Sequence, residues 1–282
     1  IAVLFGIIGF SASYYLNGYL YVAFKNNKMY DPIVSRSSHK EKATRSGGMA
    51  LFFTFCVCYG FGKAIYSMSV DLYALIAFIF IALTGMADDF FSIKYREKFF
   101  LQVFAAIVLL QSGIYIDSFH GVFGINEIPE WASYVVSIFV FIVIVNAFNL
   151  IDGIDGLAAS MALLALTHAN LSFNLILGST PPDYAAFAVL FSGALAGFLL
   201  FNLQVFNGRK IFLGDSGSML VGLMIGTALI GASQETARFA GSPNIPASLC
   251  LWTIAIPITD ITSIVIRRLI SGRSPMAPDR RH

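Results

Sequence analysis

Five aspartates lie where apolar segments of the chain end or begin, and their types and spacing suggest phosphate and metal chemistry. Asp88 and Asp89 follow one apolar run, Asp152 and Asp155 follow another, and Asp215 precedes a third. Carboxylate oxygens without a His or Cys cluster favour Mg²⁺, or alternatively Mn²⁺. Five acids exceed what one such ion needs, so the surplus could act as a general base or bind sugar and nucleoside hydroxyls.

The Asp88–Asp89 pair is the hardest to explain on structural grounds alone. A helix C-terminus carries partial negative charge, so two adjacent carboxylates there require a positive partner. A bound cation could provide it, and so could Lys94 or Lys98. A solvated turn that ends the apolar run is the alternative interpretation.

Asp155 and Asp215 each precede a new apolar segment, and an N-cap would account for either one alone. It would not account for Asn149 and Asp152, which precede Asp155 at intervals of three residues. If this segment is helical, the three polar side chains form one stripe. Glycines beside these acids permit close backbone approach and suit phosphate binding at helix N-termini. They are Gly153, Gly156, Gly214 and Gly217.

Membrane-spanning helices must position these acids. Of the 282 residues, 57% are hydrophobic and 12% charged, whereas soluble domains carry about 25% charged residues. The apolar runs are continuous, which excludes the alternating pattern of a barrel. We therefore expect an all-α, polytopic membrane protein with a single catalytic domain over residues 1–282. A span needs about 20 apolar residues, and nine are predicted: 1–23, 48–67, 72–90, 99–116, 132–150, 157–178, 184–203, 216–232 and 247–266.

The distribution of basic residues predicts the orientation. Sixteen of the 18 Lys and Arg residues lie in segments that these spans place on one side of the membrane, which is the side of the acids. The positive-inside rule makes that side cytoplasmic. The chain begins without Met and ends in a basic stretch, so we expect a piece of a longer protein, truncated at both ends, with ten or eleven helices in full.

Four motifs, in this order, resemble those of the polyprenyl-phosphate N-acetylhexosamine-1-phosphate transferases of glycosyltransferase family 4. They are Asp88-Asp89, the segment 149–156, the segment 214–218 and the Ser-Pro-x-x-Pro-Asp-Arg-x-His tail of residues 274–282. The resemblance covers roughly residues 25–282. The tail is more similar to the branch that initiates cell-surface glycans, exemplified by the undecaprenyl-phosphate GlcNAc-1-phosphate transferases, than to the peptidoglycan branch.

The resemblance implies a Mg²⁺-dependent reaction. A polyprenyl phosphate such as undecaprenyl phosphate attacks the β-phosphorus of a UDP-N-acetylhexosamine, with GlcNAc-1-phosphate as the favoured group transferred and UMP as the leaving group. The product would initiate a cell-surface glycan such as lipopolysaccharide. The implied setting is the bacterial inner membrane, with the active site on its cytoplasmic face and the bilayer itself as a partner. A homodimer is an option, and no nucleic acid partner is expected.

The resemblance also implies roles for individual residues. Asp215 would bind the metal with Asn149. Asp88 would deprotonate the lipid phosphate, with Asp89 as its partner. Two other acids would shape the nucleotide-sugar site, and four further residues would contact the substrates. The two acids are Asp152 and Asp155, and the four contact residues are Lys98, Asn202, Arg280 and His282.

Two departures from the family pattern concern the basic residues. His282 would be the first histidine of a His-x-His-His motif, but the sequence stops there. The segment 43–48 reads Ala-Thr-Arg-Ser-Gly-Gly, where the family often has Thr-Pro before the glycines, so the roles of Lys42 and Arg45 are left open. No serine or cysteine is placed with an activating base, which favours direct attack over a covalent intermediate.

Two alternative functions are considered. Phospho-N-acetylmuramoyl-pentapeptide transferase, from peptidoglycan synthesis, shares the acidic motifs. A secondary transporter also carries membrane carboxylates, but near the midplane and often with internal repeats. Here the acids gather at one edge and no repeat is found, which favours the transferase.

Overall fold

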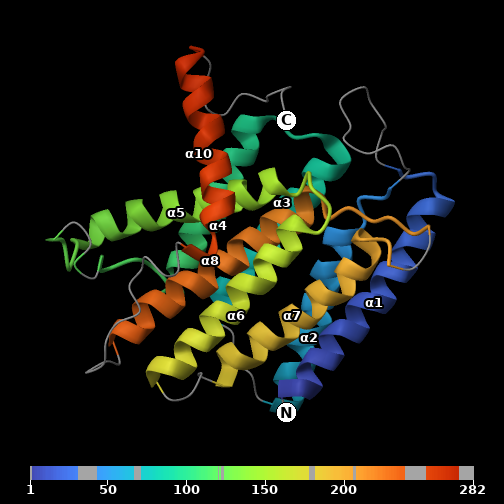
Figure 1. Ribbon diagram of the computed structural model, residues 1–282, viewed down its shortest axis with the longest axis horizontal. Helices are drawn as coiled ribbons and strands as arrows, with labels where there is room; N and C mark the ends of the chain where they lie inside the picture. The colour runs from blue at the N-terminus through green and yellow to red at the C-terminus, as the bar shows by residue number, and fades with distance from the viewer. Residues whose placement is uncertain are drawn as a thin grey trace.

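Helices form almost all of the regular structure in the residues that the computed structural model describes, which are 2–30, 43–66, 71–119, 121, 124–177, 182–205, 208–238 and 252–272. No β-strand occurs in this part of the chain. The helices are α1 (Ala2–Asn26), α2 (Gly47–Tyr66), α3 (Leu72–Phe91), α4 (Tyr95–Leu110), α5 (Glu130–Ile151), α6 (Leu157–Leu177), α7 (Pro182–Asn202), α8 (Gly214–Arg238) and α10 (Ala255–Ile270) (Figure 1).

The predicted all-α, multi-pass architecture is confirmed, but the count of nine spans is not. Within the described residues, five helices are long and apolar enough to cross a membrane: α1, α2, α3, α5 and α8. The expected span 99–116 is wrong in its bounds, because α4 begins at Tyr95 and ends at Leu110. A turn follows α4, and in it Gly113 adopts φ +81°, a left-handed conformation that helix residues avoid.

α8 is the central helix of the bundle. Its residues 216–234 are all buried inside the protein, and it packs against α2, α3, α5 and α6. A side chain at Gly222 would meet the backbone of Val145 on α5, and one at Gly226 would meet the ring of Phe141. Small residues let membrane helices approach closely. The central position of α8 brings its first turn, with Asp215, to the middle of one end of the bundle.

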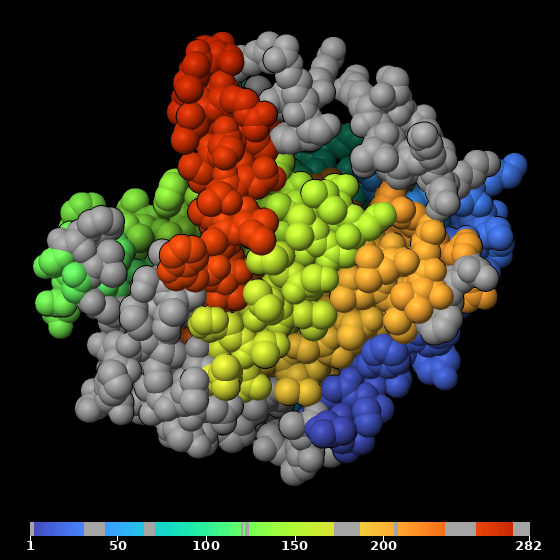
Figure 2. Space-filling view, in the orientation of Figure 1, coloured from blue at the N-terminus to red at the C-terminus, as the bar shows by residue number. Residues whose placement is uncertain are grey.

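α1 and α7 lie side by side at the periphery, as Figure 2 shows, and glycines line their contact. Gly9 of α1 lies against the backbone of Leu190, and Gly193 of α7 against that of Gly6. The Ser13 hydroxyl donates to the Ala194 carbonyl oxygen at 2.6 Å. α10 packs against α5 and projects away from the other helices (Figure 1).

Polar contacts close the bundle at both ends. At one end, Thr44 forms an isolated parallel bridge with Ile211. The bridge joins the segment before α2 to the segment before α8. At the other end, the buried Gln234 side chain of α8 accepts from the backbone N–H groups of Asp117 and Ser118 at 3.2 Å. The first of these ends holds the aspartates.

Candidate active site

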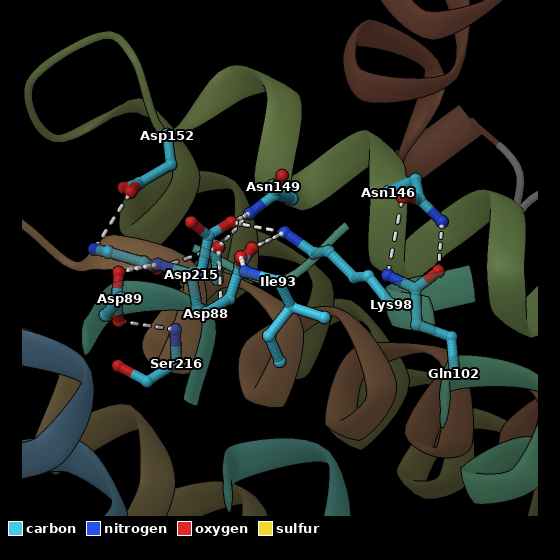
Figure 3. Close-up of polar contacts among 12 residues, drawn as sticks. Asp88, Asp89, Ile93, Lys98, Gln102, Asn146, Asn149, Asp152, Asp215 and Ser216 are labelled. Atoms are coloured by element: carbon cyan, nitrogen blue, oxygen red, sulfur yellow. Dashed lines mark hydrogen bonds and ion pairs between the residues drawn. The ribbon is translucent and has the colours of Figure 1, made fainter. Parts of the chain in front are cut away.

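A lysine between two aspartates forms the centre of the site. Lys98 Nζ, from the first turn of α4, donates to Asp88 Oδ2 at 2.7 Å and to Asp215 Oδ1 at 2.6 Å (Figure 3). The other Asp88 oxygen accepts the backbone N–H of Ile93 at 2.8 Å. The ammonium therefore neutralises charge at the C-terminal end of α3, where a positive partner was expected.

Asn149 completes this group from the last turn of α5. Its amide nitrogen donates to Asp215 Oδ1 and, at 2.9 Å, to the hydroxyl of Ser218. Ser218 in turn donates to the carbonyl oxygen of Gly214 at 2.8 Å. The structure thus brings together four residues that the sequence singled out, from four helices: Asp88, Lys98, Asn149 and Asp215 (Figure 3).

Asp89 points to a different partner, the N-terminus of α8. Its two carboxylate oxygens accept the backbone N–H groups of Asp215 and Ser216, both at 3.0 Å. Helix N-termini leave such N–H groups without an intrahelical acceptor and favour negative charge. Asp89 therefore caps α8 from another helix, and so fixes where the Asp215 side chain begins.

This cap requires the two helix ends to approach closely. Gly214 adopts φ +72°, and a side chain there would lie 2.9 Å from an Asp89 oxygen. One turn before Asp88, a side chain at Gly85 would lie 2.6 Å from the carbonyl oxygen of Asp215. Any larger residue at either position would push α8 away from α3.

Asp152 lies beside the same helix start. Its Oδ2 accepts the backbone N–H of Gly214 at 3.1 Å. Burial, reinforced by the nearby Asp215 carboxylate, raises the pKa of Asp152 well above its ordinary value. A cation bound beside these acids would oppose this shift.

The expected polar stripe of Asn149, Asp152 and Asp155 is wrong. α5 ends at Ile151, and residues 152–156 form turns, with Gly156 at φ +75°. Asp155 therefore points to the rim of the site, and 45% of the Asp155 side chain is exposed. There Lys210 donates to Asp155 Oδ2 at 2.7 Å.

Asn202 is buried and bonded to backbone on both sides. Its Oδ1 accepts from Gly156 N, and its Nδ2 donates to the Ile211 carbonyl oxygen at 2.9 Å. These bonds tie the turn after α5 to the segment before α8. Asn202 thus shapes the backbone around the site, with both ends of its amide bonded to main-chain groups.

Within the described part of the chain, Arg45 is a further cation near these acids, with its Nη1 4.0 Å from Asp89 Oδ1. Lys42, Arg280 and His282 lie outside the described residues.

Sequence reasoning missed a pair of amides beneath the lysine. Gln102 of α4 and Asn146 of α5 exchange hydrogen bonds of 3.4 and 2.8 Å (Figure 3). The available signal was their spacing, because Gln102 follows Lys98 by four residues and Asn146 precedes Asn149 by three. Such positions share a helix face.

The site chemistry is compatible with a divalent cation. Across the described residues, no three His, Cys, Asp or Glu side chains are arranged as a metal centre. Lys98 Nζ instead lies between Asp88 and Asp215. The donors are nonetheless hard oxygens, and among the described residues four carboxylates lie near one ammonium and one more distant guanidinium. This excess negative charge fits Mg²⁺ or Mn²⁺.

Apolar helices with a charged cluster at one end define a multi-pass membrane protein. The chain belongs to glycosyl transferase family 4, whose model matches residues 72–233. It is 30% identical over 259 residues to the undecaprenyl-phosphate alpha-N-acetylglucosaminyl 1-phosphate transferase of Escherichia coli K12. It is also 30% identical over 274 residues to the decaprenyl-phosphate N-acetylglucosaminephosphotransferase of Mycolicibacterium smegmatis. Each match covers 88% of the chain and 65% of the relative's length.

Proposed function

We propose that the protein transfers an N-acetylhexosamine 1-phosphate, with GlcNAc-1-phosphate favoured, from a UDP-sugar to a polyprenyl phosphate. The bonded cluster of Asp88, Lys98, Asn149 and Asp215 at one end of the apolar helices carries this proposal. A water-soluble donor and a lipid acceptor meet only at a membrane edge. The names of the relatives support a polyprenyl phosphate acceptor and an N-acetylglucosamine phosphate group.

The proposed reaction is a direct phosphoryl transfer. An oxygen of the lipid phosphate bonds to the β-phosphorus of the UDP-sugar, the bond from that phosphorus to the bridging oxygen breaks, and UMP leaves with that oxygen. Catalysis of such reactions is mainly positioning and electrostatic stabilisation. Lys98 provides positive charge for the phosphates, and Asp88 accepts the proton of a monoprotonated lipid phosphate.

The other acids of the site have supporting roles in this proposal. Asp89 and Asp152 hold the start of α8 through backbone N–H groups. Asp155, at the exposed rim, is available to the nucleoside when its ion pair with Lys210 opens. Arg280 and His282 remain proposed substrate-binding residues.

Asp215 and Asn149 would hold the divalent cation. The Asn149 nitrogen is used on Asp215 and Ser218, which leaves its amide oxygen for the cation. When bound, Mg²⁺ or Mn²⁺ would neutralise the charge that repels the two anionic reactants.

We place the protein in the bacterial inner membrane, with the site facing the cytoplasm, where UDP-sugars are available. The positive-inside pattern supports this orientation. Initiation of a cell-surface glycan and assembly as a homodimer are part of the same proposal.

The test is UMP release by purified protein from UDP-GlcNAc, polyprenyl phosphate and Mg²⁺. Asp215→Asn should reduce kcat by at least about 100-fold, because it removes a charge that positions both Lys98 and the cation. Asp71→Asn is the matched control: Asp71 caps the opposite end of α3, and Asn caps equally well. Full activity of Asp215→Asn would refute the assigned role.

The donor distinguishes the branches of the family. We expect UDP-GlcNAc or UDP-GalNAc to support UMP release and UDP-MurNAc-pentapeptide to fail. Release with the pentapeptide donor alone would assign the protein to peptidoglycan synthesis instead.

A further inference from the structure

We propose that the Gln102–Asn146 pair positions Lys98, by fixing the register of α4 against α5 so that the ammonium lies between Asp88 and Asp215. Neither amide touches the carboxylates. Their effect on the reaction would act through Lys98, and that part of the inference rests on the proposed function.

The two helices are joined by two rungs of polar contacts. In the first, Lys98 of α4 and Asn149 of α5 both donate to Asp215 Oδ1. In the second, about one helical turn further into the bundle, Gln102 and Asn146 bond each other directly. The second rung therefore repeats the alignment that the first requires.

The amide pair is a constrained contact. Gln102 is buried, with 3% of its surface exposed. Asn146 Nδ2 donates both to Gln102 Oε1 and to the carbonyl oxygen of Ile142 on its own helix, each at 2.8 Å. The second bond fixes the Asn146 side chain, so a slide or rotation of α4 would break the reciprocal pair.

The pair adds to the contacts at the start of α4, where Lys98 bonds Asp88 and Asp215. Its N-cap is Lys94, whose side chain makes no capping hydrogen bond. α4 packs against α3 and α5, and buried apolar residues of both α4 and α5 belong to the same core. Polar side chains within membrane helices are rare and usually serve function. An interhelical hydrogen bond there adds little net stability, so positioning is the better explanation.

The chemical reactivity of Lys98 tests the inference without any assay of transfer. Purified protein in detergent would receive a brief pulse of acetic anhydride, and mass spectrometry would give acetylation of Lys98 relative to the exposed Lys94. In Gln102→Leu, we expect this ratio to rise at least about fivefold, because an amine displaced from its two carboxylates reacts more readily.

Gln234→Leu is the matched control. It removes another buried glutamine, whose side chain bonds the loop after α4 at the opposite end of the bundle. Its Lys98/Lys94 ratio should equal that of the unmodified protein. An unchanged ratio in folded Gln102→Leu would overturn the inference.

A swap covers the case in which the leucine variant fails to fold. Gln102→Asn combined with Asn146→Gln keeps two amides and the same total side-chain length, whereas each single change leaves the pair too short or too long. We expect each single variant to raise the ratio and the double variant to restore it to within about twofold. Failure of the double variant to restore it would also overturn the inference.

Kinetics connect the pair to the proposed reaction. Loss of an outer residue that orients a site group costs about 10–100-fold in activity, and we expect that loss in kcat of Gln102→Leu with KM for the UDP-sugar unchanged. Gln234→Leu should keep its kcat. If the unmodified protein shows no transfer, the proposed function fails while the labelling result still decides the inference. Normal kcat in Gln102→Leu would overturn it.

Discussion

The aspartates of the site differ in their partners, and the partner limits what each residue can do. Asp88 accepts a hydrogen bond from Lys98, and Asp89 accepts from two backbone N–H groups. Asp155 accepts from Lys210 at the exposed rim. Adjacent residues with the same side chain therefore have different functions. Asp88 is the proposed proton acceptor, whereas Asp89 bonds the start of α8.

The pH dependence of Asp88→Asn tests the proton-accepting role. A phosphate monoester loses its second proton near pH 6, so an acceptor is needed only below about that value. Because about a quarter of the phosphate is fully ionised at pH 5.5 and nearly all of it at pH 8.5, we expect the deficit in kcat/KM to be about fourfold larger at pH 5.5 than at pH 8.5. UMP release across this range provides the measurement. A deficit that is constant with pH would mean that Asp88 only positions Lys98.

At the scale of helices, the site depends on the contact between the C-terminal end of α3 and the N-terminal end of α8. The C-terminal end of α3 supplies the cap for α8, and Gly85 provides the clearance for it. The unfavourable placement of two acids at a helix C-terminus is thereby offset by a neighbouring N-terminus of opposite polarity.

Gly85→Ala should separate the two helix ends. Its added methyl would lie 2.6 Å from the Asp215 carbonyl oxygen, so α8 must move and both stability and UMP release should fall. Gly60→Ala is the control, because that helical position of α2 has nothing within 4 Å of the added carbon. It should be neutral or stabilise by up to about 1 kcal/mol. Thermal unfolding in detergent distinguishes them, and equal melting temperatures would contradict the packing argument.

The sequence predicted the helices well, because long apolar runs have few alternatives. It indicated Lys98 as a partner for Asp88 because the two lie ten residues apart across one turn. It could not predict that Asp89 caps α8 or that Gln102 meets Asn146, since both contacts depend on how distant helices pack. The polar stripe through Asp155 failed for a local reason: Gly153 and Gly156 allow the turn that replaces the helix.

At the scale of the whole molecule, the two ends of the bundle differ in chemistry. One end gathers carboxylates and basic side chains from α3, α4 and α8, from the segments before α2 and α8, and from the turn after α5. The other end is closed by hydrogen bonds from the loop after α4 to the Gln234 side chain. This polarity suits a protein that meets its reactants on one side of a membrane.

The orientation can be tested with single cysteines in a variant without the three native ones. A membrane-impermeant maleimide should label Glu127→Cys, in the loop after α4, in intact cells. It should label Arg96→Cys, at the start of α4, only in inverted vesicles. Both positions are exposed, so access to one side is the only difference between them. The reverse labelling pattern would contradict the positive-inside assignment.

The long sequence separation of the α8 cap has a consequence for biosynthesis. Asp89 and its N–H donors are 126 and 127 positions apart. A nascent polypeptide that has emerged only as far as α7 contains Asp88, Asp89 and Lys98. It lacks α8, and with it Asp215 and the N–H groups that Asp89 accepts from. The site therefore cannot be complete, and the protein cannot be competent, until α8 has been synthesised and inserted.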